Sequence, residues 1–181
     1  MIQQDEIINE VWRSISGYIN YQVSSIGRVR NTETGKILKN CSRNNYYAIS
    51  ITKDGVRMGH YIHALVAQEF LDKPEVDYQL VIDHKDRNKL NNQVSNLRFV
   101  SQSQNLMNRG KGLNTSSKFK GVCWHKYNKA WRAQIGVNKT SIHLGYYEVE
   151  VEAAIVYNTK AVELFGEYAC LNELEDLSSA S

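Results

Sequence analysis

Several features that define other protein classes are scarce in this sequence of 181 residues. The three cysteines stand apart with no C-x-x-C pair, which argues against a disulfide framework and a thiolate zinc site. No apolar run approaches the ~18 residues of a membrane span, and the acidic start MIQQDEIINE is unlike a secretory signal peptide. With one proline and 42% hydrophobic residues, the composition is unlike a collagen or a disordered chain. We therefore expect a globular protein of a reducing compartment with no membrane partner.

Charge is distributed unevenly along the chain, although the formal net charge is only +3. Residues 113–147 contain six lysine and arginine residues and no acidic residue, whereas residues 148–181 contain eight acidic residues against Lys160 alone. The basic segment also contains Trp124, Trp131 and His143. Basic residues interleaved with aromatic ones indicate a nucleic-acid partner, while a solvated surface is the plainer alternative.

Hydrophobic periodicity and turn residues predict an α+β protein made of short antiparallel strands and a few helices. The Asp-Gly pair in Lys53-Asp54-Gly55 predicts a hairpin between residues 47–52 and 56–62. The other strands are expected within 11–30 and at 80–84, 96–100, 119–124, 131–137 and 140–147. Helices are expected at 63–71, 101–107 and 148–165, the last ending at Gly166.

The residues best suited to chemistry are Asp83-His84, at the end of a predicted strand, and Asn105 on the following helix. Histidine serves as a general base near neutral pH. Magnesium takes one or two carboxylate or carbonyl ligands from protein and completes its shell with water and phosphate oxygens. The spacing alone also allows a structural or incidental role for these residues.

The segment VIDHKDRNKLNNQVSNLRFVSQSQNLMN resembles the HNH endonucleases of phages and introns, and the helix HALVAQEF before it is similar to that subgroup. The resemblance implies a ββα-metal fold around one divalent cation, Mg²⁺ or another such as Mn²⁺. It implies that His84 is the general base, that Asp83 and Asn105 hold the metal, and that Asn96 braces the loop and keeps His84 oriented. Asparagine stands at the last histidine position of the family, which implies modest metal affinity. His63 is interpreted as structural or DNA-facing.

The segment EVWRSISGYINYQVSSIGRVRN resembles the small module often found ahead of such nucleases. Trp12, Tyr21 and Val23 are expected to form a small apolar core. Arg28 and Arg30 alternate onto one strand face, from which both side chains reach a phosphate backbone. Keeping an exposed strand soluble is the alternative role for these arginines.

The segment from FKGVCW to YACLN resembles the plant ethylene-response-factor DNA-binding domain, with matching features that include Lys120-Gly121-Val122 and Leu144-Gly145-Tyr146. The resemblance implies a three-stranded sheet in the DNA major groove with a helix behind it. Period-two alternation directs Ala133, Ile135, Ile142 and Leu144 inward, and Arg132, Gln134, Ser141 and His143 outward. The expected DNA-contacting residues here are Lys120, His125, Lys126, Arg132, Gln134, Lys139 and His143. Packing is preferred for both tryptophans, and a metal site at His125 and His143 is not expected.

Together these observations predict a β-rich N-terminal module at 1–46, an HNH nuclease domain at 47–108, a linker at 109–117, and a sheet-plus-helix DNA-binding domain at 118–174. The expected function is a site-directed, metal-dependent DNA endonuclease of the homing type. The expected partner is double-stranded DNA, the expected state a monomer or weak homodimer, and the expected location the cytoplasm of a bacterial or virus-infected host cell. A non-cleaving DNA-binding regulator built on the same fold is the alternative, and a nuclease for branched DNA or RNA is a third hypothesis.

Overall fold

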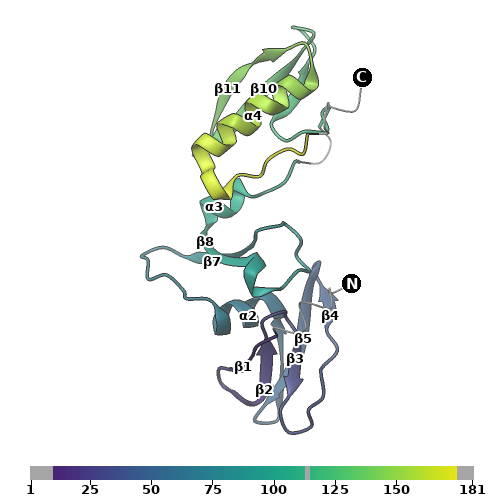
Figure 1. Ribbon diagram of the computed structural model, residues 1–181, viewed down its shortest axis with the longest axis vertical. Helices are drawn as coiled ribbons and strands as arrows, with labels where there is room; N and C mark the ends of the chain where they lie inside the picture. The colour runs from purple at the N-terminus through teal and green to yellow at the C-terminus, as the bar shows by residue number, and fades with distance from the viewer. Residues whose placement is uncertain (1–9, 113–114, 175–181) are drawn as a thin grey trace. The chain divides into compact units, whose positions relative to one another are not determined.

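The computed structural model describes residues 10–112 and 115–174, and parts of the predicted N-terminal module and linker lie outside these ranges. The chain divides into two compact units, Met1–Gln102 and Ser103–Ser181, which we describe one at a time. Antiparallel sheets with few helices, seen in the ribbon of Figure 1, confirm the α+β class. No helix in the described ranges is long and apolar enough to cross a membrane.

In its described residues, the first unit contains three antiparallel sheets and the helix α2. One sheet has the order β1-β2-β3 and a second the order β4-β5-β6, while β7 and β8 form a two-stranded sheet. The bounds are β1 (Trp12–Ile15), β2 (Tyr18–Ser24), β3 (Val29–Asn31), β4 (Cys41–Arg43), β5 (Tyr46–Lys53), β6 (Val56–Tyr61), α2 (Ile62–Phe70), β7 (Leu80–His84), the 3₁₀ turn η1 (Val94–Asn96) and β8 (Leu97–Ser101). Asp54 and Gly55, both at positive φ, form the turn between β5 and β6, which confirms the predicted hairpin.

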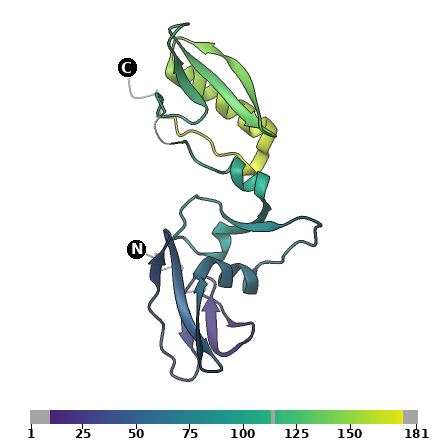
Figure 2. The ribbon, with the colours of Figure 1, turned by 180° about the vertical axis from the view of Figure 1, so that it is seen from behind.

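One hydrophobic core holds these sheets together. It joins residues of the N-terminal sheet, the β5 strand, α2 and β8. Figure 2 shows the backbone of the first unit from behind. Its buried members are Ile15, Val23, Val29, Ile49, Ile51, Ile62, Leu65, Val66 and Leu97. Each fully buried aliphatic side chain of this kind contributes ~1.5–3 kcal/mol. The segment before residue 47 and the segment after it therefore share one core.

The turn between β2 and β3 also contacts the loop that follows β7. Gly27 has φ +82°, and a Cβ added there would lie 2.9 Å from Cβ of Asn92. The amide of Val94 donates a hydrogen bond of 2.8 Å to the carbonyl of Ser25. Only glycine combines this left-handed backbone with so close an approach. The N-terminal sheet thus supports the loop next to Asp83-His84.

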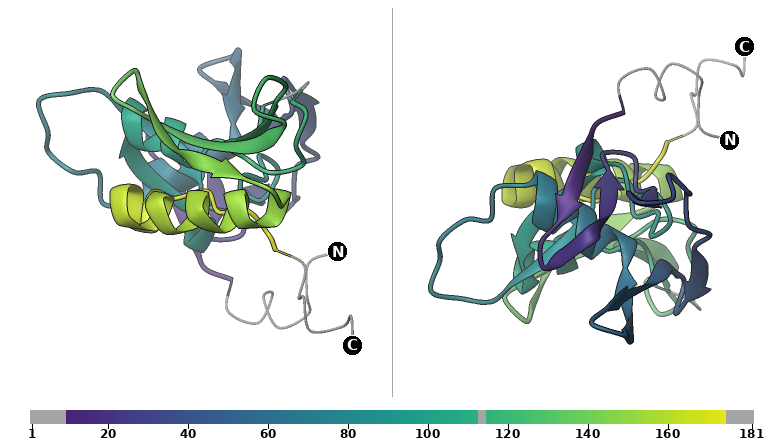
Figure 3. Two further views of the ribbon diagram at one scale, coloured as in Figure 1. Left: turned by 90° about the horizontal axis from the view of Figure 1, so that it is seen from above. Right: turned by 90° about the horizontal axis from the view of Figure 1, so that it is seen from below.

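The second unit is a three-stranded antiparallel sheet covered on one face by a helix, as the end-on view of Figure 3 shows. The sheet order is β11-β10-β9. The bounds are α3 (Gln102–Met107), whose first residue belongs to the first unit, β9 (Val122–His125), β10 (Ala130–Val137), β11 (Thr140–Tyr147), α4 (Glu150–Phe165) and the 3₁₀ turn η2 (Gly166–Tyr168). The helix α4 ends at Gly166, as predicted.

Small residues bring α4 close to its sheet. Ala153, Ala154 and Ala161 are fully buried and pack with Ala133 and Ile135 in two neighbouring clusters. The inward positions of Ala133 and Ile135 are confirmed, and Leu144 packs against both clusters. Ile142 pairs directly with the buried Ile135, which places it on the inward face as predicted, although it is 38% exposed. It lies on β11, an edge strand.

Candidate functional site

Asp83 and His84 occupy the last two positions of β7 and are both buried, with 5% and 6% of their surface exposed. The register pairs Asp83 with Arg98 and His84 with Leu97 on β8. Nε and Nη2 of Arg98 each lie 2.9 Å from Oδ2 of Asp83, in a largely buried ion pair. The end of the two-stranded sheet therefore carries both a buried carboxylate and a buried imidazole at consecutive positions.

The orientation of His84 is set by Asn92. Nε2 of the imidazole lies 3.3 Å from Oδ1 of Asn92, while Nδ2 of Asn92 donates to the carbonyl of Leu90 at 3.2 Å. Because Nδ2 is used as a donor toward Leu90, the amide presents its oxygen to the imidazole, which places the proton on Nε2. In that tautomer Nδ1 is the acceptor nitrogen of the ring.

Burial lowers the pKa of His84 below its ordinary value, because the protein interior disfavours the charged ring. The hydrogen bond from Asn92 and the charges of Asp86 and Asp83 act in the opposite direction and offset part of this effect. The neutral form of the imidazole is therefore favoured. A neutral, oriented imidazole is the form that accepts a proton from water.

Asn96 braces the loop after β7 through three hydrogen bonds. Its Nδ2 donates to Oδ1 of Asp86 at 2.9 Å and to the carbonyl of Asn91 at 2.8 Å, and its Oδ1 accepts from the amide of Asp86 at 3.0 Å. Hydrogen bonds from Asn91, the amide of Asn88 and Asn96 hold the pKa of Asp86 below its usual range, although burial raises it. A direct contact to His84 comes from Asn92, a residue of the same loop for which no role was predicted.

The donors proposed for a metal are hard oxygens, the carboxylate of Asp83 and the side-chain amide of Asn105 on α3. In the described residues there is no group of three or more His, Cys, Asp and Glu side chains that would hold a cation by themselves. One carboxylate and one amide suit an ion such as Mg²⁺ that keeps most of its positions for water and phosphate. As donor types, the two side chains therefore fit the implied cation; Asp83 belongs to the first unit and Asn105 to the second.

His63 lies nearer to His84 than the sequence indicated. It is the second residue of α2, its ring centroid is 5.3 Å from that of His84, and its Nδ1 is buried with no hydrogen-bond partner in the described part of the chain. Burial and, to a smaller extent, the charge of His84 lower the pKa of His63 to about 4. Helical spacing gave no sign of this approach, since it comes from the tertiary packing of α2 against β7.

The two arginines of the N-terminal sheet have partners within the chain. Arg28 forms an ion pair with Glu10, and Arg30 donates to Oε1 of Gln22 from Nε at 2.9 Å and Nη2 at 2.7 Å. Both guanidinium groups lie over the ring of Trp12, at 5.7 Å and 4.3 Å from its centroid. Trp12 therefore packs with these arginines, whereas Val23 is buried in the core and Tyr21 packs against it.

The face of the second unit's sheet turned away from α4 carries several of the predicted DNA-contacting side chains. Arg132 pairs with Cys123 and Tyr146, and Gln134 pairs with His143. A bulge between Ala133 and Gln134 shifts the register with β11, so that Tyr146 lies opposite Arg132. The ring of Tyr146 is 5.1 Å from that of His125 and 4.6 Å from that of His143. Tyr146 was not anticipated, because a bulge leaves no clear signature in the sequence.

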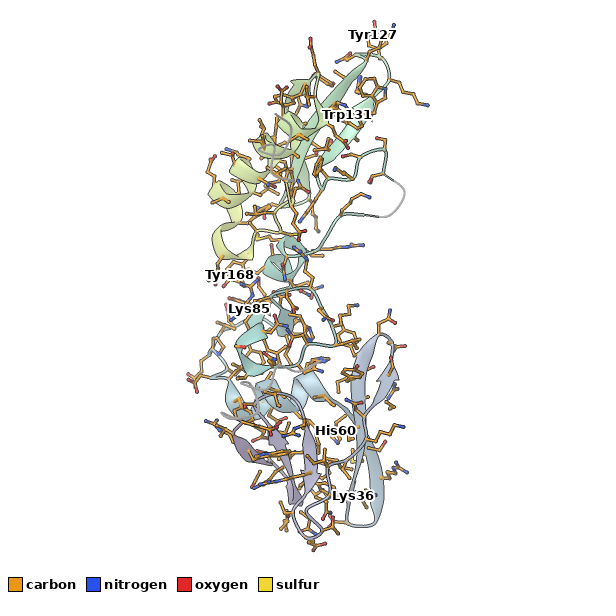
Figure 4. All side chains as sticks on the ribbon, turned by 45° about the vertical axis from the view of Figure 1, so that its right-hand side comes forward. Lys36, His60, Lys85, Tyr127, Trp131 and Tyr168 are labelled. Atoms are coloured by element: carbon orange, nitrogen blue, oxygen red, sulfur yellow. The ribbon has the colours of Figure 1, made fainter. Side chains whose placement is uncertain are left out.

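The predicted phosphate-contacting lysines lie at the edges of this unit. Lys126 and Lys139 are exposed in the two hairpin turns, the first beside Tyr127, which is 92% exposed and labelled in Figure 4. Nζ of Lys120 donates to the carbonyl of Met107 at 2.9 Å. Trp131 packs against the core, while Trp124 is 41% exposed with its ring 5.2 Å from that of Trp131. The predicted packing is thus confirmed for Trp131, and Trp124 packs against the ring of Trp131 while staying partly exposed.

Known proteins resemble separate parts of the chain. It is 38% identical over 94 residues to an uncharacterized HNH endonuclease, L245, of Acanthamoeba polyphaga mimivirus, covering 52% of this chain and 28% of that protein. It is 42% identical over 100 residues to the DNA endonuclease I-HmuI of Bacillus phage SP01, covering 54% and 56%. A match of 59 residues at 42% identity to the APETALA2-like protein 2 of Oryza sativa covers 32% of this chain and 13% of that protein.

A solved structure on DNA binding and cleavage by the HNH homing endonuclease I-HmuI matches with a TM-score of 0.50 and 41% identity, over 54% of this chain and 56% of that chain. The chain thus spans about a quarter of the length of the first relative and just over half of the length of the second. Residues 10–52 match the NUMOD4 motif, and residues 60–107 match the HNH endonuclease family. Residues 10–107 therefore resemble a NUMOD4 motif followed by an HNH endonuclease domain.

Proposed function

We propose that the protein is a divalent-metal-dependent DNA endonuclease of the HNH homing type, in which His84 is the general base. The observation that carries the proposal is the buried imidazole of His84, which follows Asp83 at the end of β7 and whose Nε2 lies within hydrogen-bond distance of Oδ1 of Asn92. Likeness to I-HmuI, whose structure concerns DNA binding and cleavage, supports the substrate class.

In the proposed reaction, Nδ1 of His84 takes a proton from a water molecule, and the water oxygen forms a bond to the phosphorus of a DNA phosphodiester. The bond from phosphorus to the leaving sugar oxygen breaks, and that oxygen takes a proton from solvent water. Asp83 and Asn105 would hold the cation, which neutralises charge on the phosphate when bound. Asn92 and Asn96 act on the reaction through position, the first by orienting His84 and the second by bracing the loop.

The second unit is proposed to hold the duplex. The outward face with Arg132, Gln134 and His143, and the resemblance to plant DNA-binding domains supported by the partial APETALA2-like match, are the grounds for this role. With one His84 site per chain, a monomer nicks one strand, and a double-strand break needs dimerisation or a second binding event. The place of action would be the cytoplasm of a bacterial or virus-infected host cell.

The test is nicking of supercoiled plasmid with Mg²⁺ by the full chain and by His84→Ala. We expect the variant to lose nicking by at least ~100-fold, the usual contribution of a general base, with little change in DNA affinity. His60→Ala is the matched control, since His60 bonds to the Tyr18 hydroxyl at 2.7 Å on the other face of the β4–β5–β6 sheet. Equal nicking by His84→Ala and the parent protein would overturn the mechanism.

One observation favours the second candidate, a DNA-binding regulator that does not cut. The ion pair with Arg98 already neutralises the carboxylate of Asp83 and weakens its attraction for a cation. A protein that shifts DNA in gels and shows no cleavage with Mg²⁺ or Mn²⁺ would be this regulator.

A further inference from the structure

A row of aromatic rings leads from the β4–β5–β6 sheet to His84. The ring of Tyr46 is 4.8 Å from that of His63 and 6.0 Å from that of His84. The ring of Tyr61 stacks on His63 at 5.5 Å, and His63 meets His84 edge-on at 5.3 Å. We call Tyr46, Tyr61 and His63 the ring row. It brings the first turn of α2, β5 and β6 together beside the proposed base.

Two cations lie over the ring row. Nζ of Lys89, from the loop after β7, is 4.7 Å from the centroid of Tyr46, and Cζ of Arg43, at the end of β4, is 5.8 Å from that of Tyr61. Other cations near His84 have hydrogen-bonding partners: Arg98 bonds to Asp83, and Lys85 to the carbonyl of Ser95 at 2.7 Å. A ring face attracts an ammonium or guanidinium group without taking all of its N–H donors. Lys89 and Arg43 are thus held in place with N–H groups available for an anion.

The sheet face beneath these cations carries positive charge only. Direct cross-strand pairing sets Arg43 opposite Tyr46 and Arg57 opposite Thr52, on the face that also bears Tyr61. The opposite face is buried through Ile49 and Ile51. No aspartate or glutamate occurs within β4, β5 or β6. A positive, partly aromatic face that ends at a general base suits a polyanion with flat apolar groups.

We propose that the ring row, together with Arg43 and Lys89 over it, forms the surface that binds the DNA strand cut at His84. Lys89 and Arg43 contact phosphate oxygens on either side of the reacting phosphodiester, and the rings of Tyr46 and Tyr61 pack against sugar or base. This inference rests on the proposed function, because it names the surface that delivers substrate to the same site.

The experiment compares Lys89→Gln and Arg43→Gln with the parent chain and with Lys53→Gln. Lys53 is the matched control, because it belongs to the same sheet and its Nζ lies over the ring of Tyr18. It pairs with Val56 and lies on the opposite face of the sheet. Binding of a short random-sequence duplex is measured over a series of salt concentrations. Supercoiled plasmid reports nicking, and circular dichroism checks the fold of each variant.

Each of the two variants is expected to weaken binding ~3–10-fold and to reduce the slope of log affinity against log salt by about 0.9, the value for one lost phosphate contact. Lys53→Gln is expected to match the parent in slope and nicking. A parent protein that neither binds nor nicks DNA would refute the proposed function itself. A parent that nicks, with unchanged slopes and rates in Lys89→Gln and Arg43→Gln, would refute the ring row alone.

Tyr46→Leu separates ring contact from charge. The change leaves Lys89 and Arg43 in the chain but removes the ring that positions Lys89. We expect the salt slope to stay near the parent value and nicking to fall several-fold, because the cation is no longer held beside His84. A Tyr46→Leu protein that folds and nicks at the parent rate would show that the ring does not position the strand.

Discussion

Replacing Asn96 by alanine tests whether the loop after β7 is held by its buried amide. Asn96 is 8% exposed and makes three hydrogen bonds, two through Nδ2 and one through Oδ1. A hydrogen bond of this kind contributes about 1 kcal/mol net, and a buried group left without its partner costs a similar amount or more. The variant should therefore lower the free energy of opening of the loop by ~3 kcal/mol.

Hydrogen exchange read by mass spectrometry on peptides from residues 80–100 measures that opening directly. Asn88→Ala is the control, since Asn88 lies in the same loop and its side chain makes one exposed hydrogen bond, to the amide of Leu90 at 3.1 Å. We expect less than ~1 kcal/mol for this change. Equal and small effects of the two substitutions would refute the view that Asn96 braces the loop. Because the loop carries Asn92, the Asn96 variant should also nick DNA more slowly than the Asn88 variant.

Two further predictions concern pH and packing. Burial, and then the charge of His84, lower the pKa of His63 from 6.5 to about 4, so the unfolded chain binds a proton between these values that the folded unit does not. The free energy of unfolding of the first unit should therefore fall as pH is lowered through this window. His63→Phe should make this free energy, measured by urea unfolding, depend less on pH. Identical pH profiles for the variant and the parent protein would contradict this. Gly121 has φ +76°, and a Cβ there would lie 2.0 Å from Cδ2 of Tyr157, so Gly121→Ala should destabilise the second unit by ~3 kcal/mol or more in thermal unfolding. Gly136→Ala, with open space around it, should cost much less, and similar melting of both variants would disprove the packing argument.

Local signals in the sequence predicted most of the secondary structure. The Asp54-Gly55 turn, the apolar spacing on α2 and the stop at Gly166 each depend on a few neighbouring residues, and the structure confirms all three. β4 was not predicted, because three exposed residues, Cys41–Arg43, show no hydrophobic alternation. The shared core of the segments before and after residue 47 also left no local trace, since it forms between residues far apart in the chain.

For the site, the sequence predicted the strand end that carries Asp83 and His84 but not the side chains that surround them. The contact from Asn92, the approach of His63 and the rings of Tyr46 and Tyr61 come from separate elements that only tertiary packing brings together. The intramolecular partners of Arg28, Arg30 and Asp83 were equally hidden. The sequence shows where a charged residue lies, but only the folded structure shows which residue pairs with it.

The contact between Gly27 and Asn92 makes the orientation of the base depend on a turn that lies 57 residues earlier than His84. The NUMOD4 match and the HNH match cover separate residue ranges, yet in the folded chain they meet at this contact and at the hydrogen bond between Ser25 and Val94. An HNH domain moved into another protein without its NUMOD4 segment would keep the residues that are proposed to react. It would lose the turn that packs against Asn92. The two segments of this chain should therefore be transferred between proteins together, as one unit.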